Sequence, residues 1–218
     1  ADCSGVTGAI ASNVAVPNGV VMISPSATSP GLTTLDDKGF FFRTAPSDAR
    51  GGQILADITK DRKVKSVAIT YTNNDYGKGL ADVYAAAVKA HGIKVTIVSA
   101  HEDGKADYSS EVATLASAGG DAVAVIGYLD QGGKGIIQGS LDSGAFDKFI
   151  LSDGMIGDSL TDAFGKDLNK SFGSMPGSMN KKTAGTFASV AKAAGIDSSG
   201  PYTGESYDAG ALIVLAMQ

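Results

Sequence analysis

The fold is constrained most by an alternation of short apolar runs with longer helix-period segments between Val64 and Gly173. This alternation is typical of βαβ units, in which helices join parallel strands and cover the sheet. We predict strands at residues 66–72, 94–99, 121–127, 148–152 and 171–175. We predict helices at residues 77–91, 109–118, 131–143 and 159–164. This part of the chain is therefore expected to form one complete doubly wound α/β lobe.

The flanking segments do not form a second lobe by themselves. They contain predicted helices at 7–16, 48–59, 181–194 and 206–217, and predicted strands at only 19–24 and 40–43. Two strands are too few for an independent sheet, which usually needs three or more. We therefore expect part of an N-terminal lobe at 1–47, a complete second lobe at 48–175 and a return into the first lobe at 176–218. Both chain ends are interpreted as cut points.

Composition argues against several classes of function. The formal net charge of -5 and the pI of about 4.9 disfavour a nucleic-acid partner, because phosphate binding needs a basic surface. No apolar run approaches the ~18 residues that span a bilayer. The sequence has no CxxC or Cys/His cluster for a structural metal, and no GxSxG, P-loop or HExxH motif. We expect neither an enzyme nor a bound cofactor.

Three isolated residues, one cysteine and two histidines, have side chains that often serve as functional groups. Cys3 is the single cysteine; by default it is a buried small hydrophobe, although its disulfide partner could lie in sequence that is absent here. His91 and His101 lie in or beside turns and have no patterned partner. We interpret both histidines as surface residues.

Tyr76, Tyr128 and Asp153 each follow a predicted strand of the complete lobe. In an open parallel sheet, ligands bind beyond the carboxyl ends of the strands. Two aromatic walls and one carboxylate suit a small cationic group on an apolar body. The alternative is that the tyrosines are ordinary rim aromatics and that Asp153 caps a helix.

The first segment offers a second candidate set. Ser4 precedes a predicted helix, whose N-terminus attracts anions, so its hydroxyl could face a carboxylate or could be a plain N-cap. Ser26 and Thr28 lie in a proline-flanked turn after a predicted strand. They are either turn formers or ligand hydroxyls.

Several motifs together resemble the leucine/isoleucine/valine-binding family of type I periplasmic binding proteins. They are GVVMISPSATSP at 19–30, FRTAPSD at 42–48, NDYGKGL at 74–80 and ADYS at 106–109, with GY at 127–128, SDG at 152–154 and SYDA at 206–209. The resemblance implies a two-lobed α/β fold that closes on its ligand by hinge bending. This chain would contain the complete second lobe and part of the first.

The resemblance also implies a set of ligand-binding residues. Ser4 matches the serine that binds the ligand carboxylate, and Asp153 matches the acid that pairs with the ammonium group, one methylene shorter than the glutamate that often occurs there. Cys3 matches a cysteine that is disulfide-bonded in some members. The remaining matches are the turn residues Ser26, Ala27 and Thr28 and the aromatic residues Tyr76 and Tyr128.

The function implied is that of a periplasmic solute-binding protein. Such a protein captures a branched-chain or other aliphatic amino acid between its lobes and delivers it to the permease subunits of an ABC transporter. A ligand-sensing domain of a receptor or signalling protein is the alternative. A flavodoxin-like enzyme is a third candidate, for which the sequence carries no motif.

Overall fold

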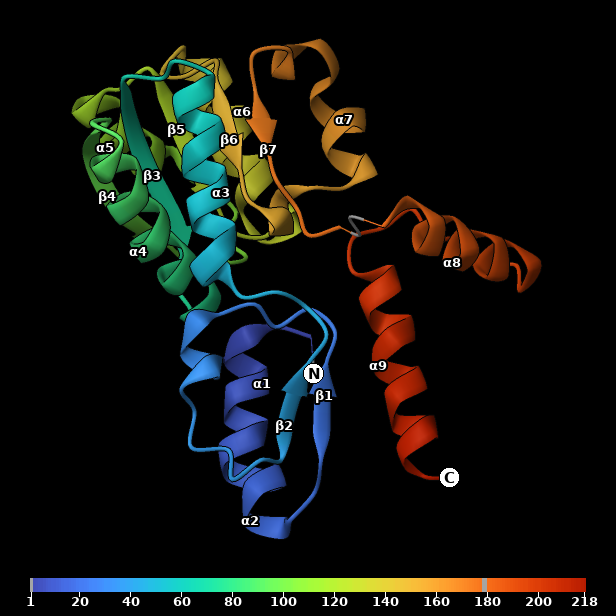
Figure 1. Cartoon of the computed structure of the whole chain (residues 1–218). Coiled ribbons are helices and arrows are strands. Elements are labelled where there is room, and N and C mark those ends of the chain that lie inside the picture. The colour runs from blue at the N-terminus through green and yellow to red at the C-terminus, as the bar shows by residue number, and fades with distance from the viewer. Residues whose placement is uncertain (1, 178–179) are drawn as a thin grey trace. The chain divides into compact units, whose positions relative to one another are not determined.

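The computed structural model describes residues 2–177 and 180–218 (Figure 1). The chain divides into two compact units. Unit 1 comprises Ala1–Ser47 and Pro176–Gln218, and unit 2 comprises Asp48–Met175. Unit 2 contains a five-stranded sheet, whereas the described residues of unit 1 include one pair of strands.

Unit 2 is built on a parallel sheet with the strand order β4-β3-β5-β6-β7. This confirms the predicted five-stranded parallel α/β fold. The last two strands are shorter than predicted, because only a few residues pair along that edge. The strands are β3 (Ser66–Thr72), β4 (Lys94–His101), β5 (Ala122–Ile126), β6 (Phe149–Leu151) and β7 (Phe172–Gly173).

Helices cover both faces of this sheet (Figure 1). Alternate residues of β3 point to opposite faces, so Val67 and Ile69 pack with one helix pair while Ala68 packs with the other. Because β5 is buried on both faces, it consists entirely of apolar residues. The first pair is α3 (Asp48–Asp61) and α4 (Asp75–Ala90); the second is α5 (Ser109–Ala118) and α6 (Gly133–Ser143), with α7 (Asp158–Phe164) beside it.

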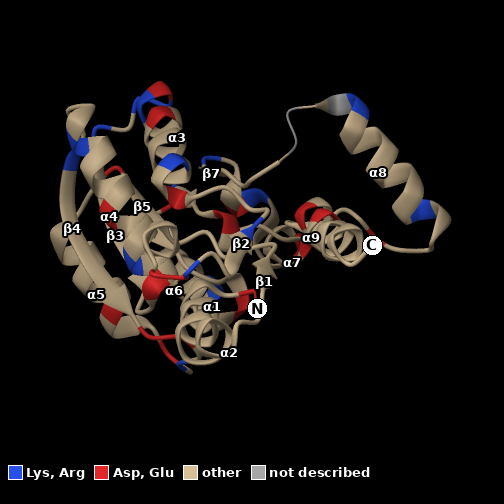
Figure 2. Cartoon of the chain, turned by 60° about the horizontal axis from the view of Figure 1, so that its bottom comes forward, with Lys and Arg blue, Asp and Glu red and all other residues tan. Residues whose placement is uncertain are grey.

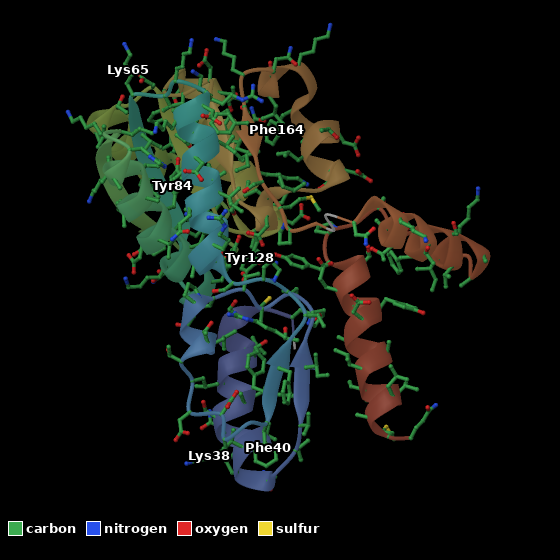
Figure 3. The ribbon with its side chains drawn as sticks, viewed as in Figure 1. Lys38, Phe40, Lys65, Tyr84, Tyr128 and Phe164 are labelled. Carbon is green, nitrogen blue, oxygen red and sulfur yellow. The ribbon has the colours of Figure 1, made fainter. Side chains whose placement is uncertain are left out.

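One buried polar pair in unit 2 joins helices α3 and α4. Tyr84 of α4 is fully buried, and its hydroxyl lies 3.0 Å from the hydroxyl of Thr59 on α3 (Figure 3). The Thr59 hydroxyl in turn donates to the Leu55 carbonyl at 2.7 Å. Burial raises the pKa of Tyr84, which keeps its proton in place.

Unit 1 begins with a long helical segment followed by two paired strands. Helix α1 (Ser4–Ile10) continues through a π-helical turn (Ala11–Ala15) into α2 (Val16–Asn18). Strands β1 (Met22–Ser24) and β2 (Phe41–Arg43) are parallel, with Ser24 opposite Arg43. Helix α1 starts three residues earlier than predicted, and its N-cap is Cys3. The reading of Ser4 as a plain N-cap is therefore wrong.

Two further helices complete unit 1. They are α8 (Lys181–Ala193) and α9 (Thr203–Ala216). The hydroxyl of Thr44, just after β2, donates to the Glu205 carbonyl of α9 at 2.8 Å. Four consecutive apolar residues of α9 are exposed: Leu212, Ile213, Val214 and Leu215. Within the described parts of the chain, no helix combines the length and apolar character needed to cross a membrane.

Two predictions about isolated residues were wrong. Cys3 is exposed rather than buried. His101, the last residue of β4, is only 2% exposed, and the Tyr108 ring lies edge-on to its imidazole with the ring centroids 6.2 Å apart. Tyr108 lies beyond the end of β4, at the N-cap of α5, so the alternation of residues along the strand does not indicate this contact with His101. His91 is partly exposed and lies 2.7 Å from the carboxylate of Asp57.

Most charged side chains lie on the surface. Lys and Arg are interspersed with Asp and Glu over unit 2 (Figure 2). The pairs Lys78–Asp82 and Lys134–Asp130, at 2.7 and 2.6 Å, are solvent-accessible and contribute little to stability. Among residues 2–177 and 180–218, no group of three or more His, Cys, Asp or Glu side chains is arranged to hold a metal ion.

Candidate functional site

The carboxyl edge of the unit 2 sheet brings together Tyr76, Tyr128 and Asp153. Tyr76 lies in the first turn of α4 after β3, Tyr128 follows β5, and Asp153 follows β6. The two tyrosine rings are stacked, with centroids 5.2 Å apart and planes inclined by 26°. The Tyr76 hydroxyl lies 2.6 Å from Asp153 Oδ1. Lys65, just before β3, marks the opposite end of the sheet from Tyr128 (Figure 3).

Two members of this group are buried, and Tyr128 is partly buried. Tyr76 is 3% exposed and Asp153 is 8% exposed. Burial, and then the negative charge of Asp153, raise the pKa of the Tyr76 hydroxyl well above its usual value. The hydroxyl therefore keeps its proton and donates it to the carboxylate, forming a charge-assisted hydrogen bond. Asp153 begins a short 3-10 turn with no side-chain cap of its own, so the helix-cap reading of Asp153 is not what the structure shows.

Ser152 is a member of the group that the sequence did not point to. Its Oγ lies 3.0 Å from the Tyr76 hydroxyl and accepts from the backbone N–H of Gly127 at 3.3 Å. The N–H of Gly154 donates to the Tyr76 hydroxyl at 3.3 Å. Ser152 thereby ties the turn after β5 to the turn after β6. Only its position beside Asp153 in the SDG motif could have indicated this role.

Two glycines allow close backbone approaches at this edge, Gly154 between the turns after β6 and β5 and Gly77 between α4 and the end of β3. A Cβ at Gly154 would lie 2.4 Å from the carbonyl oxygen of Gly127, and a Cβ at Gly77 would lie 2.2 Å from the carbonyl oxygen of Thr72. Both contacts are with backbone atoms, so a side chain at either position would force the backbone of the sheet edge to shift. The glycines of the NDYGKGL and SDG motifs are thus required by close packing at the sheet edge.

In unit 1, the turn after β1 contains the other predicted residues. The Ser24 hydroxyl accepts from the N–H groups of Ala27 and Ser26, at 3.0 and 3.4 Å. Ser4 Oγ accepts from the N–H of Ser29 at 3.1 Å, which joins the start of α1 to the turn. The Ser26 hydroxyl donates to the carbonyl of Asp2 at 2.9 Å. The structure thus brings Ser4 together with the turn.

Thr28 has the most unusual environment in this turn. It is 1% exposed, and its Oγ1 has no hydrogen-bond partner among the described residues. A buried hydroxyl without a partner costs about 1–3 kcal/mol. Such a group is tolerated where a ligand atom completes its hydrogen bonding, so Thr28 is a candidate ligand contact.

Stacked tyrosines and an anchored carboxylate at the strand ends of an α/β unit are the arrangement expected of a small-ligand-binding protein. Residues 1–193 match the family model described as the receptor family ligand binding region. The chain therefore belongs to this family, that of the type I periplasmic binding proteins, as its motifs suggested. This is a family of binding proteins rather than of enzymes.

Relatives among characterised sequences are Leu/Ile/Val-binding proteins. Leu/Ile/Val-binding protein homolog 3 of Brucella melitensis is 38% identical over 136 residues, which cover 59% of this chain and 37% of that protein. Homolog 1 of the same species is 34% identical over 168 residues, covering 74% and 43%. The chain thus spans less than half the length of these relatives.

Solved structures show the same fold. A leucine-binding protein, LivK, from Thermotoga maritima superposes with a TM-score of 0.86 at 23% identity, covering 100% of this chain and 62% of that one. A type 1 periplasmic binding protein from Bordetella pertussis gives a TM-score of 0.77 at 22% identity, covering 88% and 53%.

Proposed function

We propose that this protein binds an aliphatic amino acid, branched-chain members included, reversibly and without chemical change. The observation that carries the proposal is the buried carboxylate of Asp153, fixed by the Tyr76 hydroxyl beside the stacked rings of Tyr76 and Tyr128. A buried carboxylate is stabilised by a cationic partner. The ammonium group of an amino acid is such a partner, and the aromatic rings would cover the ligand.

The carboxylate of the ligand would be bound by the turn after β1. Thr28 would donate its hydroxyl, which is buried and has no partner among the described residues. Ser4 Oγ already accepts a hydrogen bond from Ser29, so its own proton is available for donation to the ligand. Ser26 and Ala27 would form the wall of the turn, with their N–H groups held by Ser24.

For the whole protein we propose delivery of the amino acid to the permease subunits of an ABC transporter, from a periplasmic location. Relatives named as Leu/Ile/Val-binding proteins support this role. The second candidate function is ligand sensing. It is favoured by the family model, whose description is the ligand binding region of receptors.

Calorimetric titration of the natural full-length protein with a panel of amino acids tests the proposal. Leucine, isoleucine, valine and alanine should be compared with N-acetylleucine and leucinamide, which each lack one of the two charges. At least one free amino acid should bind, and both blocked forms of it should bind at least tenfold more weakly, about 1.4 kcal/mol. N-acetylleucine that binds as tightly as leucine, or a panel with no ligand, would contradict the proposal.

A further inference from the structure

Arg43 reaches the candidate ligand turn from the neighbouring strand. It ends β2 directly opposite Ser24, the last residue of β1. Its Nη1 donates to the carbonyl oxygens of Ala27, at 3.2 Å, and Ser29, at 2.9 Å. Its Nη2 donates to the hydroxyl of Thr33 at 2.5 Å. One guanidinium group therefore holds three acceptors on both sides of Thr28.

These bonds fix the peptide group that precedes Thr28. The Ala27 carbonyl and the Thr28 N–H belong to the same peptide plane and point in opposite directions in a trans peptide. No cis peptide bond occurs among the described residues. Because the Ala27 carbonyl points at Arg43, the Thr28 N–H points away from the guanidinium.

The peptide group that follows Thr28 is fixed from another direction. Its N–H, on Ser29, donates to Ser4 Oγ at 3.1 Å. Thr28 is thus held between Arg43 and Ser4, and its hydroxyl stays buried although it has no hydrogen-bond partner among the described residues. The N–H groups of Ser26 and Ala27 are already bound to Ser24. Among the described residues, the Thr28 hydroxyl therefore remains as a donor for a ligand.

We infer that Arg43 is a positioning residue that orients Thr28 for binding the ligand carboxylate. The inference rests on the proposed function and adds a residue to it. Arginine suits this role because its planar fork can donate to several acceptors in fixed directions. Lysine has one compact ammonium group on a flexible stem and cannot reproduce that arrangement.

The test is a double-mutant cycle in the natural full-length protein, with affinity measured calorimetrically for the best amino acid. Arg43→Gln should weaken binding about tenfold or more, and Arg43→Lys should not restore it. In a Thr28→Val background, the same Arg43→Gln change should have a much smaller effect, because the group that Arg43 positions is gone. Arg50→Gln, which changes an exposed arginine of α3 bonded only weakly to Gln53, should leave affinity unchanged.

Equal losses from Arg43→Gln in both backgrounds would overturn the inference, since a purely structural role does not depend on Thr28. If Arg43→Gln does not fold, Thr33→Val removes only the third acceptor and should give a smaller loss with the same dependence on Thr28. If the parent binds no amino acid, the proposed function fails, and amide NMR of the ligand-free protein decides the inference instead. Arg43→Gln should then shift the Thr28 and Ser29 amide signals and speed their hydrogen exchange, and unchanged signals would overturn it.

Discussion

Among single residues, Asp153 and Tyr76 show most clearly how burial creates a binding group. Asp153 resembles the surface carboxylates in chemistry, but it is 8% exposed and lies 2.6 Å from the Tyr76 hydroxyl. Tyr76 holds one oxygen in place, and Ser152 and Gly154 hold Tyr76. The motif SDG identified the position of the acid. The tyrosine that orients it comes from 77 residues earlier, so this contact depends on the fold.

His101 makes stability depend on pH. Burial lowers the pKa of His101 from 6.5 to about 4, although Asp103, Glu111 and Glu102 act in the opposite direction. Its Nδ1 lies 2.8 Å from the Thr70 hydroxyl, and its Nε2 is buried without a partner among the described residues. Between pH 6.5 and 4 the unfolded chain gains a proton on this ring that the folded chain does not. The stability linked to His101 is therefore complete above pH 6.5 and is lost as the pH falls towards 4.

We predict that the free energy of unfolding decreases across this range by an amount on the order of 3 kcal/mol due to His101. Urea unfolding at several pH values measures it. His101→Gln should flatten the dependence, because the buried imidazole is then absent. The same pH dependence in the parent and in His101→Gln would rule out this role for His101.

Among the elements, the junction of β3 and α4 positions the site most directly. Asn74 is the N-cap of α4, and its side chain accepts from the N–H groups of Tyr76 and Gly77, both at 3.1 Å. The Tyr76 ring stacks on Tyr128. Gly77 packs closely against the backbone of Thr72. The cap therefore fixes the first turn of the helix and the starting point of the Tyr76 side chain.

Replacing the cap should destabilise the protein. Asn74→Ala should lower the free energy of unfolding by about 0.5–2 kcal/mol, since two N–H groups lose their acceptor. Asn74→Ser, which keeps an acceptor of suitable length, should recover most of the loss. Both values come from urea denaturation at pH 7. Equal stability of Asn74→Ala and the parent would show that the cap is not important for α4.

Elements with a clear period and local end signals could be predicted from the sequence. Strand β3 and helix α5 have the predicted bounds, because their apolar pattern stops where turn residues begin. The start of α1 was placed too late, since Cys3 provides no side-chain cap to mark it. The π-helical turn in that helix also follows from no local pattern in the sequence.

For the molecule as a whole, the sequence predicted which strand ends carry polar residues, but not how those residues are held. Tyr76, Tyr128 and Asp153 were selected because parallel strands end at one edge. Ser152 and Arg43 were not selected, because their contacts join segments that are distant in sequence. Arg43 reaches acceptors 14 and 16 residues away, and no periodicity marks such a contact.

Calorimetric titration of Asp153→Asn in the natural full-length protein tests most directly whether Asp153 pairs with the ligand ammonium group. Asparagine keeps the shape and the acceptor for Tyr76 but removes the charge. With the amino acid that the parent binds best, we predict a loss of about 2–5 kcal/mol. Ser4→Ala, which removes a neutral donor, should cost about 0.5–1.5 kcal/mol. An Asp153→Asn protein that binds this amino acid as tightly as the parent would contradict the pairing of Asp153 with the ligand ammonium group.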